Sequence, residues 1–207
     1  MAEGAGGGVS GTFLAGLRSR SAPVVCLIAV SCPALAEVTS SVENRTHPVP
    51  GTTARAVVRH MLRHPFPGDH GAAFANIRPH YRLTLDVGDS GRLCRVEDVG
   101  VSIRFVVTLP VAADRARMTG GVRAAWDEFA SFARRHEETH KQSYLSCARA
   151  FVSRARIATA TTCSGLRSEV RRMFDEARRS CEARQVPFDR QQSLAVRRLR
   201  LFDMAGY

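Results

Sequence analysis

The sequence contains no apolar run long enough to cross a bilayer as a helix. A spanning helix needs about 20 consecutive apolar residues, whereas the most apolar stretch, residues 22–30, is followed at once by Ser31, Cys32 and Pro33. We therefore expect no stable membrane anchor. The chain also lacks internal repeats, and its 44% hydrophobic and 24% charged residues are typical of a globular domain rather than a disordered chain.

Lysine is almost absent, since Lys141 is the only one among 30 basic residues and arginine supplies the rest. Against 19 acidic residues this leaves a formal net charge of +11, which attracts anionic partners. The arginines gather in the last third of the chain, where a solvated helix face is the usual interpretation. The alternative is attraction to anionic envelope polymers or acidic protein substrates. We identify no groove-reading or base-stacking element, so we expect no nucleic-acid partner.

The N-terminal residues show the order of a secretory signal peptide. Arg18 and Arg20 precede the apolar stretch 22–30, and the small residues Ala34 and Ala36 follow it. This order predicts a signal peptide over residues 1–36, cleavage near Ala36 and a periplasmic or secreted protein. A disordered cytosolic leader is the alternative. A lipid anchor on Cys32 is not expected, because the residues before it fit a lipid-attachment motif poorly. Residues 37–207 would form a single domain.

Cleavage there would remove two of the six cysteines and leave an even set. The remaining cysteines are Cys94, Cys147, Cys163 and Cys181. Four cysteines in an exported chain indicate two disulfides, because oxidising compartments allow such bonds to persist.

Hydrophobic periodicity predicts an α+β domain, in which a small antiparallel sheet packs on a long helix that is followed by a disulfide-braced antiparallel helix hairpin. A short strand near residues 46–49 precedes a helix that Thr52 or Thr53 caps and Pro65 ends. Alternating residues predict strands over 81–87 and 93–107, with Pro110 as a terminator. We expect the remaining helices at 122–157, at 166–185 and after Pro187.

The long helix contains His136-Glu137-Glu138-Thr139-His140, an H-E-x-x-H spacing. Residues four apart lie on one helix face, so both imidazoles can bind one zinc ion. Glu137 follows the first ligand and can act as general base toward a zinc-bound water. The alternative is a pair of core histidines, which would leave two imidazoles and a carboxylate in need of polar partners.

A catalytic zinc needs a third protein ligand. The metzincin pattern is excluded, because Ser143 and Ser146 stand where that pattern has Gly and His. If the last two helices are antiparallel and Cys147 pairs with Cys181, His140 lies opposite position 188. This register makes Asp189 the candidate third ligand. A helix cap after Pro187 is the alternative role for Asp189.

Together these features resemble a bacterial family of uncharacterised domains described as predicted secreted zinc-dependent proteases. The resemblance runs from about Val49 to Arg190 and rests on the Tyr-led strand, the alternating strand that ends in Leu-Pro, Trp126 and Phe129 before the HEETH helix, and Cys163. It implies zinc held by His136 and His140 with Glu137 as base, and a disulfide between Cys94 and Cys163. The Cys147–Cys181 pair would then be an addition in this chain.

One segment departs from the family pattern. In the family pattern a Tyr-Asp pair is followed by a Thr-x-His-Gly segment. In this chain the corresponding pair, Phe188-Asp189, is followed by Gln192-Ser193-Leu194-Ala195. If the missing His is the family's third ligand, this protein binds zinc more weakly, recruits Asp189, or has lost catalysis.

We therefore expect an exported zinc metallopeptidase that hydrolyses peptide bonds. The strand at residues 101–107 would align an extended peptide or protein substrate, and Tyr144 would pack in the core rather than stabilise an oxyanion. The alternative is a non-catalytic exported binding or structural protein of the same fold with a degenerate metal site.

Overall fold

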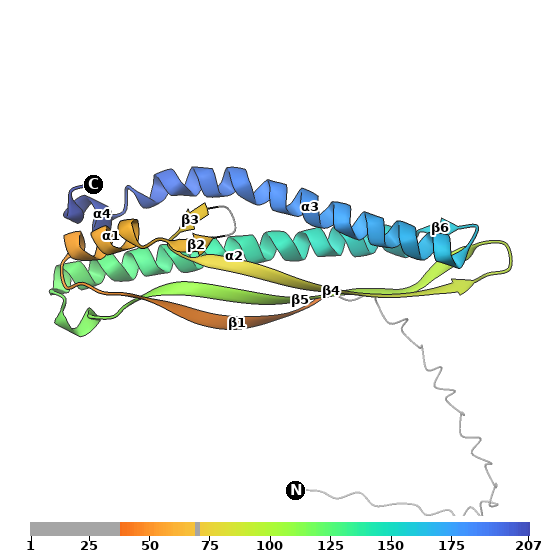
Figure 1. The fold of residues 1–207 in the computed structure, drawn as a ribbon, viewed down its shortest axis with the longest axis horizontal. Helices are drawn as coiled ribbons and strands as arrows, with labels where there is room; N and C mark the ends of the chain where they lie inside the picture. Colours follow the sequence, from red (N-terminus) through yellow and green to blue (C-terminus); the bar gives the residue numbers. More distant parts are fainter. Residues whose placement is uncertain (1–37, 69–70) are drawn as a thin grey trace, which may run out of the picture. The chain divides into compact units, whose positions relative to one another are not determined.

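The computed structural model describes residues 38–68 and 71–207, which belong to one compact unit, and the signal peptide expected at residues 1–36 lies outside them. Figure 1 shows the elements along this unit. In chain order they are β1 (Val38–Val49), α1 (Ala54–Arg63), β2 (Phe66–Gly68), β3 (Gly71–Ala73), β4 (Asn76–Asp89), β5 (Cys94–Ala112), the 3-10 turn η1 (Arg115–Arg117), α2 (Gly120–Arg156), β6 (Thr159–Ala160), α3 (Cys163–Val196) and α4 (Arg200–Ala205).

The fold is of the expected α+β class, but its sheet is mixed rather than antiparallel throughout. The strand order is β1-β5-β4, with β4 antiparallel and β1 parallel to the central β5. The cause is the path of the chain. The segment from α1 to β3 reverses the direction after β1, and the turn after Asp89 reverses it again, so β5 returns parallel to β1.

Two strands are longer than their sequence patterns predict. β1 covers twelve residues rather than residues 46–49 alone, because its whole length pairs with β5. β5 continues through Pro110, where we expected it to end. Pairing with β4 stops at Thr108, so β5 is an edge strand at Pro110, and edge strands tolerate proline.

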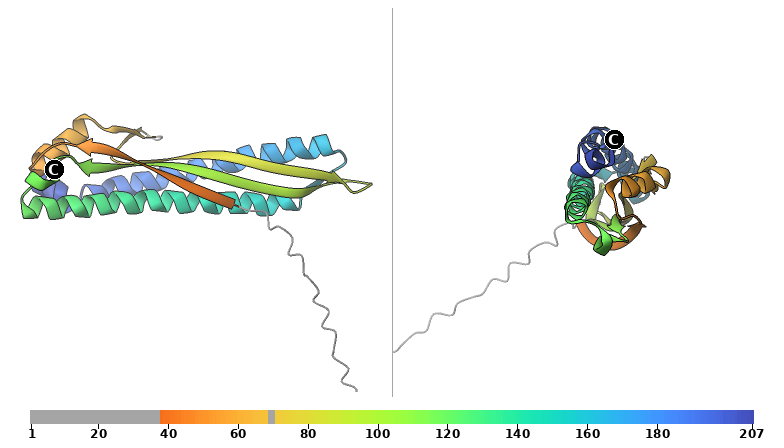
Figure 2. Two further views of the ribbon diagram at one scale, coloured as in Figure 1. Left: turned by 90° about the horizontal axis from the view of Figure 1, so that it is seen from below. Right: turned by 90° about the vertical axis from the view of Figure 1, so that its left-hand side faces the viewer.

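The helices cover one face of this sheet, as Figure 2 shows. α2, capped by the Thr119 hydroxyl, packs on β5 through two apolar clusters. One cluster joins the first turns of α2, including Trp126 and Phe129, to α1 and α4. The other joins Tyr144 and Phe151 to the sheet and α3. The HEETH segment lies between the two clusters. No helix of the described residues is both long and apolar enough to cross a membrane.

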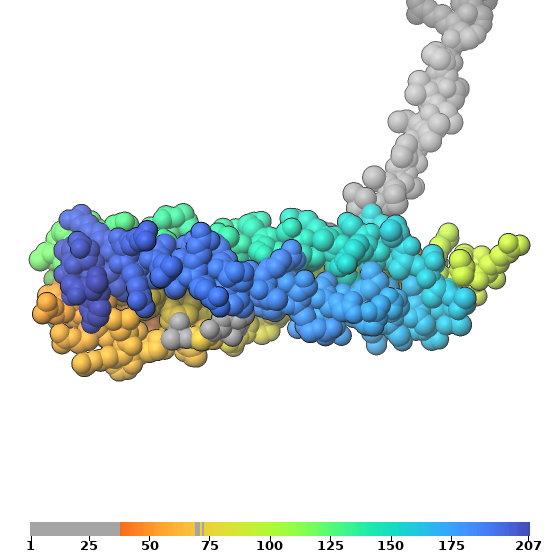
Figure 3. Space-filling model, turned by 90° about the horizontal axis from the view of Figure 1, so that it is seen from above, coloured from red at the N-terminus to blue at the C-terminus, as the bar shows by residue number. Residues whose placement is uncertain are grey.

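α3 runs as one helix from Cys163 to Val196, although we expected a break at Pro187. Proline removes one hydrogen bond to the carbonyl four residues earlier. That carbonyl belongs to Ala183, which is exposed together with Pro187, so water can satisfy it. The other face of α3 packs against α2, so the helix continues past Pro187. Figure 3 shows the outer surfaces of the two helices side by side.

Both expected disulfides are present. Cys94–Cys163 joins the start of β5 to the start of α3, with the two Cα atoms 5.0 Å apart. Cys147–Cys181 joins α2 to α3, with the two Cα atoms 6.1 Å apart. The second bond sets the antiparallel register of the two long helices, which places residues of α3 against the HEETH segment.

Replacing both Cys147 and Cys181 by alanine is expected to lower the free energy of unfolding by about 3–4 kcal/mol. The bond closes a loop with a sequence separation of 34 residues, and its removal restores that chain entropy to the unfolded state. Urea denaturation of the double variant measures the effect. Ser180→Ala, at an exposed neighbouring position on α3, is the control. A loss under about 1 kcal/mol would contradict this prediction.

Candidate metal centre

The two histidines of the HEETH segment project from the face of α2 that meets α3. The side chain of His140 is 7% exposed and that of His136 is 19% exposed. Their ring centroids are 4.5 Å apart, and their Nε2 atoms approach to 2.9 Å. The helical spacing predicts this arrangement, because side chains four residues apart stand one above the other.

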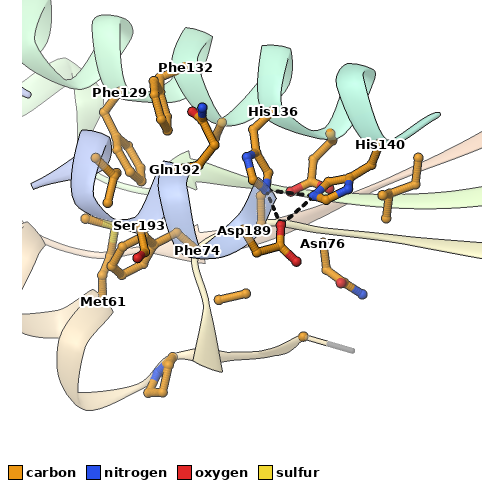
Figure 4. Close-up of a pocket in the computed structure, with 18 of the residues that line it drawn as sticks. Met61, Phe74, Asn76, Phe129, Phe132, His136, His140, Asp189, Gln192 and Ser193 are labelled. Atoms are coloured by element: carbon orange, nitrogen blue, oxygen red, sulfur yellow. Dashed lines mark hydrogen bonds and ion pairs between the residues drawn. The ribbon is translucent and has the colours of Figure 1, made fainter. Parts of the chain in front are cut away.

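Asp189 of α3 completes a compact group with the two rings. Its Oδ1 atom lies 2.7 Å from His140 Nε2 and 3.2 Å from His136 Nε2, as Figure 4 shows. The antiparallel register deduced from Cys147 and Cys181 is therefore correct. Oδ1 is buried and has no hydrogen bond of good geometry among the described residues, although both rings are close.

Gln185, one turn before Asp189, orients the ring of His140. Its Nε2 donates to the carbonyl of Cys181 at 2.8 Å, and its Oε1 lies 2.9 Å from His140 Nδ1. A backbone carbonyl can only accept a hydrogen bond, so the Gln185 amide must direct its NH₂ group toward Cys181 and its oxygen toward His140. Because an amide oxygen also only accepts, Nδ1 of His140 must carry the proton. Nε2 of His140 then directs a lone pair toward Asp189 and His136, which is the orientation of a metal ligand.

Phe188 holds the ring of His136. The two rings stack, with centroids 4.9 Å apart and an interplanar angle of 17°, and Phe188 also meets His140 edge-on. Nδ1 of His136 is buried without a hydrogen bond in the described chain. Stacking on Phe188 and the contacts of Nε2 with His140 and Asp189 therefore orient this ring.

The pKa values of the group are shifted in opposite directions. Burial lowers the pKa of His140, but Asp189 and Gln185 outweigh burial, and the net pKa lies above its ordinary value. Burial raises the pKa of Asp189, but the contacts with His136 and His140 outweigh it, and the net pKa lies well below its ordinary value. The group thus favours one cation among its three side chains. A proton and a metal ion would compete for this position.

The geometry fits a divalent metal ion. Tetrahedral zinc with bonds of about 2.0–2.1 Å has ligand atoms about 3.3–3.5 Å apart. The three atoms here are separated by 2.7, 2.9 and 3.2 Å, so an ion needs only a slight widening of the triangle. Two imidazole nitrogens and one carboxylate oxygen converge, and His136, His140 and Asp189 form a group that could hold a metal ion.

Glu137 lies beside this group and lines the same cavity, whose volume is about 390 Å³. The carboxylate is almost completely buried, and its charge contributes to the raised pKa of His140. Gln192 and Ser193 also line the cavity, one turn beyond Asp189. They occupy the segment where the family pattern has its late His, so α3 presents Asp189 but no histidine to the cavity.

Tyr144 and the strand at residues 101–107 were given roles in the sequence analysis, and the structure supports the first role but not the second. Tyr144 is buried, and its phenol donates a hydrogen bond to Glu182 at 3.0 Å, which agrees with a role in the core. The strand at residues 101–107 cannot align a substrate as we expected. These residues belong to β5, which pairs with β1 on one side and β4 on the other, so no backbone edge is left for a peptide.

Gln185 and Phe188 were not identified from the sequence. Gln185 precedes Asp189 by one helical turn, so the same helix register could have indicated it. Phe188 follows Pro187, and the expected helix break obscured its place on the α3 face.

Fold and site define an α+β domain with a candidate metal centre on an HExxH helix. The chain belongs to a bacterial family described as "Bacterial protein of unknown function (DUF922)", whose model matches residues 44–195. The match includes the HEETH segment, Asp189 and all four disulfide cysteines. No curated protein and no solved structure matches the chain.

Gln185→Leu is expected to weaken Zn²⁺ binding by about 10–100-fold, the usual effect of losing a partner that orients a metal-bound histidine. Leucine fills a similar volume but accepts no hydrogen bond from Nδ1 of His140, so the ring loses its tautomer preference. Competition with a chelating dye measures the affinity. Gln191→Leu, at an exposed α3 position, is the control. Equal affinities in both variants would show that Gln185 does not orient the ring.

Proposed function

We propose that the protein is an exported zinc metallopeptidase that hydrolyses peptide bonds. The convergence of His136 Nε2, His140 Nε2 and Asp189 Oδ1 beside Glu137 carries the proposal. Catalytic zinc sites use three protein ligands with nitrogen and oxygen donors and leave one position open. The donor set here has that composition, and it borders a cavity in which a substrate can lie.

The chain's own residues have defined tasks in this reaction. Zinc bound by the group would act as a Lewis acid that polarises the scissile carbonyl and acidifies a water molecule. The Glu137 carboxylate accepts a proton from the attacking water, whose oxygen bonds to the carbonyl carbon. Glu137 then returns this proton to the amide nitrogen as the C–N bond breaks, so the products are a carboxylic acid and an amine, which ionise in water to a carboxylate and an ammonium group. Gln185 keeps His140 in the tautomer that leaves Nε2 unprotonated.

Two features support export. The order of residues 1–36 is that of a signal peptide, and all four cysteines of the described chain form disulfides. Such bonds persist in the periplasm and outside the cell, whereas cytosolic thiols are kept reduced.

The arginines support an association with anionic envelope polymers as an additional property. Those from the end of α2 to α4 are all exposed and lie on helix surfaces or in the turn after α3 rather than in the core; they are Arg154, Arg156, Arg167, Arg171, Arg172, Arg178, Arg179, Arg184, Arg190, Arg197, Arg198 and Arg200. Such a surface raises the local concentration of polyanions, and the effect weakens with salt.

Metal analysis and a peptide screen of the protein beginning at residue 37 test the proposal together. We expect one zinc per chain and cleavage of members of a broad peptide library, detected by mass spectrometry. Stoichiometric zinc without any cleavage would overturn the peptidase and favour the alternative, a non-catalytic exported protein of the same fold with a structural metal. Absence of zinc would overturn both the centre and the reaction.

A further inference from the structure

The cavity beside the metal centre has two chemically different parts. His136, Glu137, His140 and Asp189 line one part. The other part extends along α2 toward its N-terminal end. Figure 4 shows Phe129 and Phe132 beside His136 on this helix, and it shows Met61 and Phe74 on the opposite side of the cavity. Ala133 and Val196 also belong to this second part, which we call the apolar pocket; its lining residues are Met61, Phe74, Phe129, Phe132, Ala133 and Val196.

We propose that the apolar pocket binds a bulky hydrophobic side chain of a peptide substrate, at a residue next to the cleaved bond. The inference rests on the proposed function and names its substrate class. Ala133 and Phe132 lie about one turn before His136 on the same helix face, so the pocket begins where the metal centre ends. A side chain that fills the pocket therefore holds its own backbone close to Glu137.

The size of the cavity agrees with this occupant. Its volume of about 390 Å³ lies near the lower end of the roughly 300–1,000 Å³ usual for ligand sites. Such a space accommodates one large side chain and the adjoining backbone.

The sheet supports a peptide as the ligand. β4 begins at Asn76 and is an edge strand of the described sheet, and Ala75 and Ile77 line the cavity. An extended peptide can add to an exposed strand edge through backbone hydrogen bonds while a side chain enters a pocket. β4 is thus the outer strand beside the cavity, whereas β5 is the central strand of the sheet.

Charge restricts the side chain further. Outside the metal centre and Glu137, the charged residue among the described residues of the cavity lining is Arg197, which is exposed and directly follows α3. The described residues of the apolar pocket include no carboxylate that could compensate an ammonium or guanidinium group, so lysine and arginine side chains are disfavoured there. Aspartate would lose its hydration among the aromatic rings.

Peptides of one sequence that differ only at the residue after the cleaved bond test the inference. With phenylalanine or leucine we expect kcat/KM about 10–200-fold above that with alanine, aspartate or lysine. Ala133→Leu narrows the pocket and should abolish the preference. Ser131→Leu, with the same side chain at an exposed site of α2, should retain it. Phe132→Ala is the second variant if Ala133→Leu does not fold, and it should lower the preference by removing an aromatic wall.

Binding gives a readout that does not need catalysis. Trp126 is the single tryptophan, and its ring centroid lies 5.4 Å from that of Phe129. Titration of the metal-free protein with the phenylalanine peptide should change its fluorescence, whereas the aspartate peptide should not.

The outcomes separate the two proposals. Cleavage without a preference for phenylalanine and leucine would overturn the inference and leave the peptidase. No cleavage with a fluorescence response to the phenylalanine peptide would overturn the peptidase and support the pocket as a peptide site. A response to a fatty acid but not to the peptide would overturn the inference, because the pocket would then be a lipid site.

Discussion

Glu137→Gln is expected to lower kcat for peptide hydrolysis by about 10²–10⁴-fold while one zinc per chain is retained. The amide has nearly the shape of the carboxylate but cannot accept a proton from water. His136, His140 and Asp189 are unchanged, so the metal centre stays intact. Steady-state kinetics on a cleaved peptide, with metal analysis of the same sample, measures both quantities.

Glu138→Gln is the matched control for this prediction. Glu138 is the next residue of the HEETH segment, but its side chain is exposed and forms an ion pair with Lys141. Its replacement should leave kcat within about twofold, because a surface ion pair contributes little. Equal values of kcat for Glu137→Gln and the unchanged protein would show that Glu137 is not the general base. Its buried carboxylate would then have a structural role only.

His140→Ala is expected to weaken Zn²⁺ binding by more than about 100-fold, beyond the effect of losing an orienting partner such as Gln185. Asp189→Asn should also lower the affinity, because the amide keeps the shape but loses the negative charge that balances the ion. The physical reason is that each side chain supplies one of three converging donor atoms. Competition with a chelator followed by metal analysis measures the affinity.

His80→Ala is the control, because His80 is an exposed histidine on β4 outside the metal centre. A variant Asp189→Asn with unchanged zinc affinity would exclude Asp189 as third ligand and direct attention to Gln192 or Ser193 in the cavity. Unchanged binding in His140→Ala would exclude the centre as a whole.

The positions of the metal-centre residues could be deduced from the sequence to an unusual extent. His136 and His140 meet because helical spacing is local and needs no tertiary information. Asp189 could be located only because a disulfide links the two helices, and a single cross-link determines the register of an antiparallel pair. The structure places Asp189 Oδ1 2.7 Å from His140 Nε2, in agreement with that register.

Other features could not be deduced because they depend on contacts distant in sequence. Residues 38–45 have little strand pattern of their own, and they form a strand because β5 offers a parallel edge. Pro187 is a helix breaker by local rules, but packing on α2 and exposure of the freed carbonyl allow α3 to continue. That continuation brings Phe188 and Asp189 onto the face that meets His136.

Three features follow from local periodicity or composition alone: the HEETH spacing, the even set of cysteines beyond residue 36 and the α+β class. Three others depend on packing between distant segments: Gln185 orients His140, β4 rather than β5 is the edge strand beside the cavity, and an apolar pocket adjoins the candidate metal centre. The reason is physical: these features are created where α2, α3 and the sheet pack together, and side chains from distant segments acquire their neighbours only there.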